Sequence, residues 1–136
     1  RAITEVRHTL SINAATPSQF AALAALEGPQ EPVAEMVAEY ARRRAYLMPA
    51  FDRMGLTYGP PGGAFYLYVN VSSTGLGADA FCLRLLQEAR VMVFPGALFG
   101  DDSDRYMRIG YLQPMHRIEE AAERIERFVR SVRGAA

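Results

Sequence analysis

Residues 91–111 read VMVFPGALFGDDSDRYMRIGY, a stretch in which two strand-like runs flank a loop. The first run, residues 91–94, is apolar throughout and stops at a Pro-Gly pair, which is typical of the end of a strand. The polar loop 100–104 follows, and residues 106–111 form the second run. The stretch therefore predicts two strands of a small sheet.

The residues on either side of this stretch complete the pattern. Residues 64–71 follow a proline- and glycine-rich turn and predict another strand, in which Phe65 and Leu67 face one way and Tyr66 faces the other. A helix that Asp79 can cap comes next, and a long helix closes the chain. The order strand, helix, strand, strand, helix predicts a small α+β sandwich with helices on one face of the sheet.

The N-terminal part predicts helices after an irregular start. Residues 1–13 show only a brief alternating or irregular apolar pattern. Residues 16–19, TPSQ, resemble a capping box with proline at the first helical position, and their helix stops at the next Gly-Pro pair. A longer helix runs from about Glu31 to Gly55. We expect Pro49 to bend this helix or to end its regular hydrogen bonding early.

Composition and charge exclude several classes of protein. The 136 residues include 15 Lys+Arg and 15 Asp+Glu, and the isoelectric point near 6.9 argues against a nucleic-acid binder or a polybasic membrane-surface protein. No apolar stretch approaches the roughly 20 residues of a membrane helix, and no signal peptide opens the chain. The single cysteine, Cys82, excludes an internal disulfide and is expected in the core. A reducing cytosol fits best.

The basic residues of this chain are all arginine. A mechanism that needs a lysine amine, such as one through a Schiff base, cannot be completed by these residues. The sequence also begins at Arg1 rather than at methionine. We therefore expect the chain to be a piece of a longer protein.

Arg108 is the leading candidate for chemistry, because it lies in the middle of a predicted strand. Burying an unpaired charge costs several kcal/mol, so the side chain must face solvent, a partner or a ligand. It is either a solvent-facing arginine on a half-exposed sheet or a guanidinium fork that grips a carboxylate by two hydrogen bonds. The loop 95–100 either lets a ligand approach the backbone or is a plain connection.

The remaining polar residues are expected to have no catalytic role. His116 is predicted at the surface in the first turn of the last helix, and His8 in a strand or a loop. The run 42–44 of three arginines is predicted to be a solvated helical face. No metal-ligand pattern is present in the sequence.

Five stretches in order resemble the C-terminal part of class I/II, fold-type I, pyridoxal-phosphate-dependent aminotransferases. The similarity covers nearly the whole chain, and the spacing between the stretches suits that family. The stretches are residues 11–26 (SINAATPSQFAALAAL), 40–44 (YARRR), 61–68 (PGGAFYLY), 91–100 (VMVFPGALFG) and 106–111 (YMRIGY).

The resemblance implies a division of the chain. Residues 1–30 would be the tail of the large domain that binds pyridoxal phosphate. Residues 31–136 would be the small C-terminal domain, a short sheet covered by helices, including the long interdomain helix. The parent enzyme would be a homodimer, since members of this family are typically dimers whose active sites are completed across the interface. The single cysteine would place it in the cytoplasm.

The resemblance also implies roles for particular residues. In this family an arginine on the strand after the PGxxFG loop binds the α-carboxylate of the substrate, and Arg108 matches that position. Phe65 and Tyr66 would be wall residues of the same cleft, or else core and sheet-face aromatic residues. Ala97 stands where the family often has serine, so a hydroxyl contact is absent there. The lysine that holds the cofactor lies upstream in the family, so this chain would be inactive alone.

The parent enzyme would move an amino group between an amino acid and a 2-oxo acid through pyridoxal phosphate, or would be a related lyase or synthase. Two alternatives are a free-standing α+β domain that binds or senses a carboxylate ligand without catalysis, and a structural interaction domain. In either alternative, the apolar helix 17–26 should be covered by residues of this chain. If that helix is bare, a missing partner domain is the natural explanation. The amino acid that serves as substrate stays open.

Overall fold

A computed structural model describes residues 2–100 and 103–134. The chain divides into two compact units, Arg1–Met36 and Val37–Ala136, and helix α3 (Glu31–Arg53) has residues in both. Within the described ranges, no helix is long and apolar enough to cross a membrane. Residues 101–102 of the predicted polar loop, and the chain start at residue 1, lie outside the described residues.

Residues 2–10 form helix α1 (Ala2–Leu10), so the irregular or strand-like start predicted for residues 1–13 is wrong. Its apolar residues Ile3, Val6 and Leu10 recur at steps of three and four, which is the period of a helix rather than of a strand. His8 therefore lies on a helix, and its expected place in a strand or loop is wrong.

Helix α2 (Thr16–Glu27) begins one residue earlier than a capping box requires. Thr16 is already helical, so its hydroxyl does not fill the N-cap position, which belongs to Ala15 and has no side-chain cap. Gln19 Nε2 donates instead to the carbonyl oxygen of Ala14 at 2.8 Å. The predicted capping box is wrong, and Pro17 is the second residue of the helix instead of the first, still within the first turn, where proline is tolerated.

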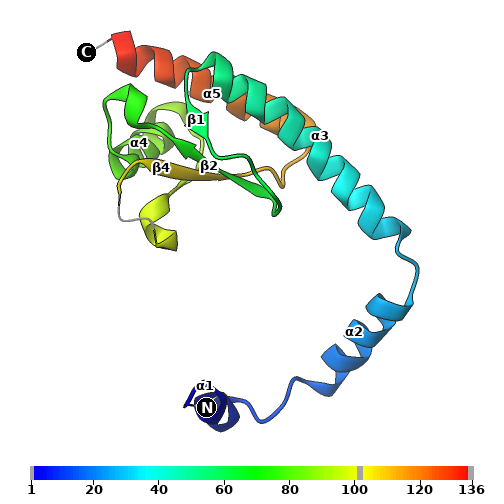
Figure 1. The fold of residues 1–136 in the computed structure, drawn as a ribbon. Helices are drawn as coiled ribbons and strands as arrows, with labels where there is room; N and C mark the ends of the chain where they lie inside the picture. Colours follow the sequence, from blue (N-terminus) through cyan, green and yellow to red (C-terminus); the bar gives the residue numbers. More distant parts are fainter. Residues whose placement is uncertain (1, 101–102, 135–136) are drawn as a thin grey trace. The chain divides into compact units, whose positions relative to one another are not determined.

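The second unit is built on a four-stranded antiparallel sheet with the order β1-β2-β4-β3 (Figure 1). The predicted strands are present but shorter, as β2 (Tyr66–Asn70), β3 (Phe94–Pro95) and β4 (Tyr106–Gly110). Residues 91–93 of the first predicted strand precede β3 and make no strand pairing. The pattern also missed β1 (Thr57–Tyr58), because two residues are too few to show a period.

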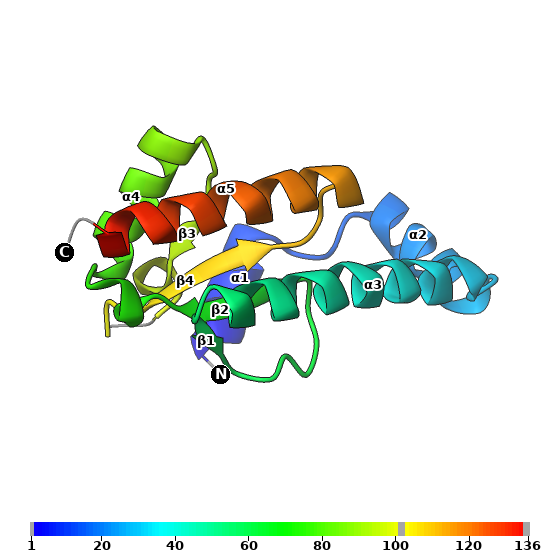
Figure 2. The same cartoon turned by 90° about the horizontal axis from the view of Figure 1, so that it is seen from above.

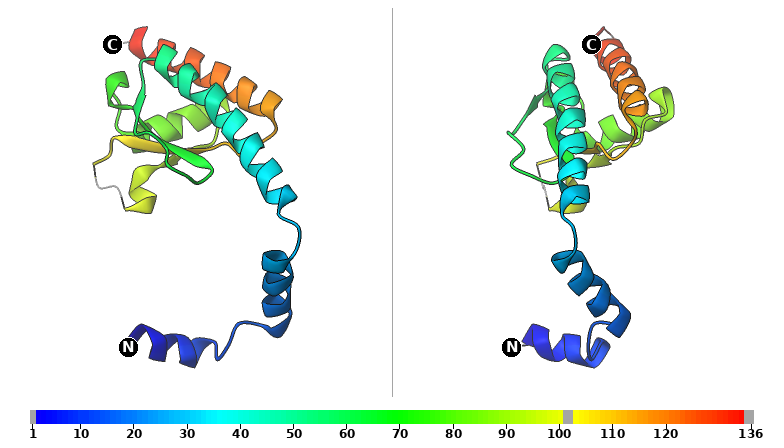
Figure 3. Two further views of the ribbon diagram at one scale, coloured as in Figure 1. Left: turned by 45° about the vertical axis from the view of Figure 1, so that its right-hand side comes forward. Right: turned by 90° about the vertical axis from the view of Figure 1, so that its right-hand side faces the viewer.

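Helices cover one face of this sheet and form the core with it. Helix α3 runs beside α5 (Met115–Gly134), as Figures 2 and 3 show, and α4 (Ala78–Arg84) packs near β3 and β4. The predicted arrangement of helices on one sheet face is thus observed. The core-facing side chains of the two central strands are nearly fully buried, as the alternation predicts: Leu67, Val69, Met107 and Ile109.

Phe65 does not share the core face with Leu67, which corrects the predicted alternation. Its side chain is 45% exposed, and it precedes β2 instead of belonging to it. The reason lies in Ala64, whose φ of +64° turns the chain just before the strand begins.

Helix α3 continues four residues beyond Pro49 to Arg53, so the predicted early end is wrong. Proline removes only one backbone hydrogen bond, and the burial of Leu47 and Phe51 on either side of it holds the helix against the core. The helix stops just before Gly55, as predicted, where φ is +65°.

Asp79 does not cap α4, because the helix begins at Ala78 and Asp79 already lies in its first turn. The cap comes from Asp104, far away in the sequence. Its Oδ1 accepts a hydrogen bond from the Asp79 amide at 3.0 Å, and its carbonyl oxygen accepts one from the Ala78 amide at 2.9 Å. This contact ties the loop before β4 to the start of α4.

The substitution Gly77→Ala tests this cap. A Cβ at position 77 would lie 2.0 Å from Asp104 Oδ2, so the carboxylate must move and its bond to the helix is lost. We expect the free energy of unfolding, measured by urea denaturation, to fall by about 1–2 kcal/mol. In an Asp104→Ala background the same substitution should cost much less, and equal costs in both backgrounds would contradict the assignment.

Candidate functional site

Arg108 lies at the middle of β4 on the sheet face that the helices leave open. The register places it opposite Tyr68 of β2 and opposite Phe94 of β3. Its neighbours Met107 and Ile109 point to the core, so alternation along the strand sends the Arg108 side chain the other way. A rigid central strand therefore presents this half-buried guanidinium on the open face.

Aromatic rings surround the Arg108 guanidinium. The carbon Cζ lies 3.4 Å from the centroid of the Phe99 ring, 5.0 Å from that of Tyr66 and 6.0 Å from that of Phe94. Cation–π attraction to these rings favours the charged group without using its N–H donors. Across the described ranges, the Arg108 side chain makes no hydrogen bond or ion pair, so all of its donors are free for a ligand.

The segment after β3 brings Phe99 to the arginine. Helix η3 (Gly96–Phe99) follows the Phe94–Pro95 strand and ends at Gly100, where φ is +91°. Figure 1 shows this short helix, in yellow, on the side of the sheet away from α3 and α5. The loop 95–100 therefore lies against Arg108 through Phe99. Ala97 is exposed on this helix.

Tyr111 holds the segment that leads into Tyr66. Its hydroxyl donates to the carbonyl oxygen of Ala64 at 2.8 Å, and its amide donates to the carbonyl oxygen of Phe65 at 2.9 Å. Its side chain is 1% exposed, and burial raises the pKa of its phenol. A neutral, buried tyrosine thus fixes the entrance to β2 beside the site.

Tyr66 contacts the Arg108 guanidinium directly, whereas Phe65 contacts only the Tyr66 ring. The Phe65 and Tyr66 rings meet edge to face, with centroids 5.7 Å apart. The interpretation of Tyr66 as a sheet-face residue agrees with its half-buried place on the open face. Neither Phe94 nor Phe99 was predicted as a site residue, although Phe99 lies in the loop 95–100 considered for ligand approach and Phe94 ends the predicted strand before it. Placing them against Arg108 needed the pairing of β3 with β4.

The remaining polar residues that the structure describes do not cluster as metal ligands. Within residues 2–100 and 103–134, no group of three or more His, Cys, Asp or Glu side chains could hold a metal ion. His116 is exposed in the first turn of α5, as predicted. Cys82 is buried, as predicted, and burial is the main cause that raises the pKa of its thiol to about 12.

The prediction that residues 42–44 form a solvated face is wrong for Arg43. Its side chain is 15% exposed, and it donates to the carbonyl oxygens of Leu112 at 2.8 Å and Tyr111 at 3.3 Å. It also pairs with Glu39, whose pKa is held near 2 by hydrogen bonds from Arg42 and Arg43. Arg43 thus joins α3 to the end of the strand that bears Arg108.

An antiparallel sheet with helices on one face and a guanidinium among aromatic rings on the other defines an α+β domain suited to binding an anionic ligand. The family model described as aminotransferase class I and II matches residues 2–125. The chain belongs to this family, as the resemblance predicted.

Named relatives agree with this membership. The aspartate aminotransferase of Bacillus sp. (strain YM-2) is 40% identical over 135 residues, which cover 95% of this chain and 34% of that protein. The aspartate aminotransferase of Pyrococcus abyssi is 40% identical over 114 residues, 82% of this chain and 29% of that protein. The chain thus spans about a third of the length of the curated relatives it matches.

Solved structures confirm the fold class. A crystal structure of an aminotransferase from Mycobacterium tuberculosis superposes with a TM-score of 0.85 at 32% identity, covering 96% of this chain and 35% of that chain. The described part of this chain therefore has the α+β fold of the corresponding part of fold-type I aminotransferases.

Proposed function

We propose that this chain is the C-terminal part of an aminotransferase that moves an amino group between an amino acid and a 2-oxo acid, and that Arg108 binds the α-carboxylate of both. The observation that carries the proposal is a half-buried guanidinium on a rigid strand, ringed by aromatic side chains and without a polar partner in the described part of a chain of this family. An α-carboxylate is common to every amino acid and 2-oxo acid, so one fixed clamp can orient all of them.

The aromatic rings make this arginine suited to a carboxylate. Phe99 stacks on the guanidinium and leaves its N–H edges available for two parallel hydrogen bonds. Apolar walls exclude water and lower the local dielectric, which strengthens such a charged pair. We propose that Tyr66 and Phe65 form a wall of the substrate cleft on this face.

Pyridoxal phosphate supplies the electron sink for transfer of the amino group in enzymes of this class. The residues of this chain do not fit its covalent attachment, because the sequence contains no lysine. We infer that the attachment residue belongs to another part of the polypeptide and that the chain is inactive alone.

The exposed apolar residues of the N-terminal helices support the proposal that a further domain packs on them in the whole protein. Helix α2 has no buried residue, and Phe20, Leu23 and Leu26 are each at least half exposed. A bare apolar helix of this kind favours the partner-domain explanation over a free-standing module. We propose that residues 1–30 belong to the large cofactor-binding domain and residues 31–136 to the small domain. We propose further that the whole enzyme is a cytoplasmic homodimer.

The coding region upstream of residue 1 provides the first test. We expect an open frame that encodes a lysine within some tens of residues and an acidic residue farther upstream. The longer protein, loaded with pyridoxal phosphate, should form a 2-oxo acid from an amino acid, whereas the 136-residue chain should form none. A start codon next to residue 1 would overturn the enzyme proposal in favour of a carboxylate-binding domain.

A further inference from the structure

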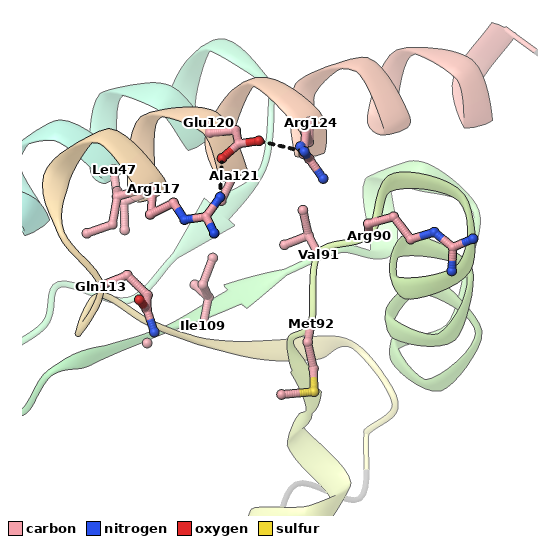
Figure 4. Close-up of a pocket in the computed structure, with 12 residues that line it drawn as sticks. Leu47, Arg90, Val91, Met92, Ile109, Gln113, Arg117, Glu120, Ala121 and Arg124 are labelled. Atoms are coloured by element: carbon pink, nitrogen blue, oxygen red, sulfur yellow. Dashed lines mark hydrogen bonds and ion pairs between the residues drawn. The ribbon is translucent and has the colours of Figure 1, made fainter.

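The second unit has a cavity of about 380 Å³ on the helix-covered side of β4. Its walls come from α5, from residues 90–92 before β3 and from the end of β4, as the close-up in Figure 4 shows. Ile109, which lines it, points to the opposite face of the strand from Arg108. The cavity is therefore separate from the carboxylate clamp. The lining residues are Leu47, Arg90, Val91, Met92, Ile109, Gly110, Gln113, Arg117, Ile118, Glu120, Ala121 and Arg124.

Positive charge predominates in this cavity, where Arg117 and Arg124 flank the single glutamate of the lining, Glu120; Figure 4 shows the side chain of the third lining arginine, Arg90, directed away from them. Arg117 Nη1 lies 2.9 Å from Glu120 Oε2, and Arg124 Nη2 lies 2.5 Å from Glu120 Oε1. Figure 4 shows these two guanidinium groups brought toward each other by the shared carboxylate. Arg90 lines the same cavity, and no ion pair or hydrogen bond of its side chain is found in the described ranges.

Glu120 organises the two arginines without satisfying them. The hydrogen bond from Arg117, together with the charge of Arg124, lowers the pKa of Glu120, which stays ionised. One carboxylate neutralises only one of the two guanidinium groups. Each guanidinium has five N–H donors, so donors remain for a further acceptor. The pair is thus a preformed site for an added negative charge.

The floor of the cavity is apolar. Leu47, Ile118 and Ile109 are each less than 9% exposed, and Met92 at 66% exposure stands at the rim. A volume of this size falls in the range of small-molecule sites, and a few polar groups on apolar walls are typical of them. A peptide or protein partner needs a far larger contact area than these residues offer.

We propose that this cavity binds a small organic anion whose carboxylate meets Arg117 and Arg124 and whose hydrocarbon part lies on Ile109 and Val91. The charge selects an acid over its neutral analogue, and the apolar floor selects an acid with a hydrocarbon chain over an inorganic anion. The site lies across one strand from the clamp, so both can be occupied at once.

Hexanoate and hexan-1-ol form a matched pair of probes, which share a hydrocarbon chain and differ in charge. We expect hexanoate, titrated into the full 136-residue chain, to shift the amide NMR signals of Val91, Ile109 and Ala121 in a saturable way. Hexan-1-ol should bind about tenfold more weakly or worse, since loss of one charged contact is of that order. Acetate should also bind more weakly, because it cannot cover the floor.

Variants locate the binding. Arg117→Met and Arg124→Met should each weaken hexanoate about tenfold while leaving the spectrum that of a folded protein. Arg130→Met, on the same helix with a side chain 76% exposed, is the matched control and should change nothing. In Arg108→Gln the hexanoate shifts should remain.

Three results would overturn the proposal: no saturable shift, equal binding of hexanoate and hexan-1-ol, or unchanged affinity in the Arg117 and Arg124 variants. Loss of the shifts in Arg108→Gln alone would assign the acid to the clamp instead. Different residues test the two proposals: Arg108 tests the carboxylate clamp, and Arg117 and Arg124 test the cavity. A negative result for one proposal therefore leaves the other standing.

Discussion

In the full-length enzyme, Arg108→Gln is expected to lower kcat/KM for every amino-acid substrate by about 30- to 4,000-fold, since removing one partner of a desolvated charge pair costs about 2–5 kcal/mol. Glutamine keeps much of the side-chain length but loses the charge and the two-pronged donor. The rings of Phe99 and Tyr66 would remain and would no longer face a cation. Steady-state kinetics with two chemically different amino acids measure the effect.

A more specific measurement than kcat/KM for one substrate is the ratio of kcat/KM for an amino acid to that for the corresponding amine, which lacks the carboxylate. The wild-type enzyme should favour the amino acid, and Arg108→Gln should remove most of this preference because it acts only on the carboxylate contact. Arg108→Lys should fall between the two, since it keeps the charge without the fork. Arg130→Gln, on the exposed face of α5, is the control. An unchanged preference in Arg108→Gln would exclude Arg108 as the carboxylate contact.

Local patterns predicted the centre of the fold and of the site. The charged residue in the middle of β4 is visible in the sequence and singled out Arg108, and the alternation over β2 predicted the sheet face of Tyr66, whose place in a substrate cleft was implied only by the family resemblance. Phe94 and Phe99 could not be assigned in this way. Their positions depend on antiparallel pairing of β3 with β4 and on the short helix η3 that follows.

Two of the wrong predictions, for Asp79 and for Arg43, have the same physical cause: the hydrogen-bond partner comes from a distant part of the sequence instead of from the neighbouring residues. Asp79 is a residue type that often caps helices, but the cap comes from Asp104, 25 residues along the chain, whose carboxylate accepts from the Asp79 amide itself. Arg43 belongs to a run that resembles a solvated face, yet carbonyl groups some 70 residues away accept its N–H groups. Propensity describes the segment alone, whereas these contacts exist only after the sheet and helices have packed.

Truncating a core aromatic residue should have the largest effect on stability. Phe81 of α4 is 0% exposed, and its ring meets that of Phe128 edge to face at 5.2 Å between centroids. Phe81→Ala removes this contact and leaves a cavity between α4 and α5, so we expect the free energy of unfolding to fall by about 3–5 kcal/mol. Domains of this size have about 5–15 kcal/mol in total, so much of the stability would be lost.

Leu83, two residues along the same helix, is the matched control because its side chain is 57% exposed. Leu83→Ala should change the free energy of unfolding by at most about 0.5 kcal/mol, and Phe81→Leu should fall between the two alanine variants. Urea denaturation of the three variants, followed by circular dichroism, gives the comparison. Similar costs for Phe81→Ala and Leu83→Ala would mean that α4 does not pack on α5 through Phe81. The order Phe81→Ala, Phe81→Leu, Leu83→Ala follows from the burial of the two positions and from the volume that each substitution at Phe81 removes, since all three lie within one turn of the same helix.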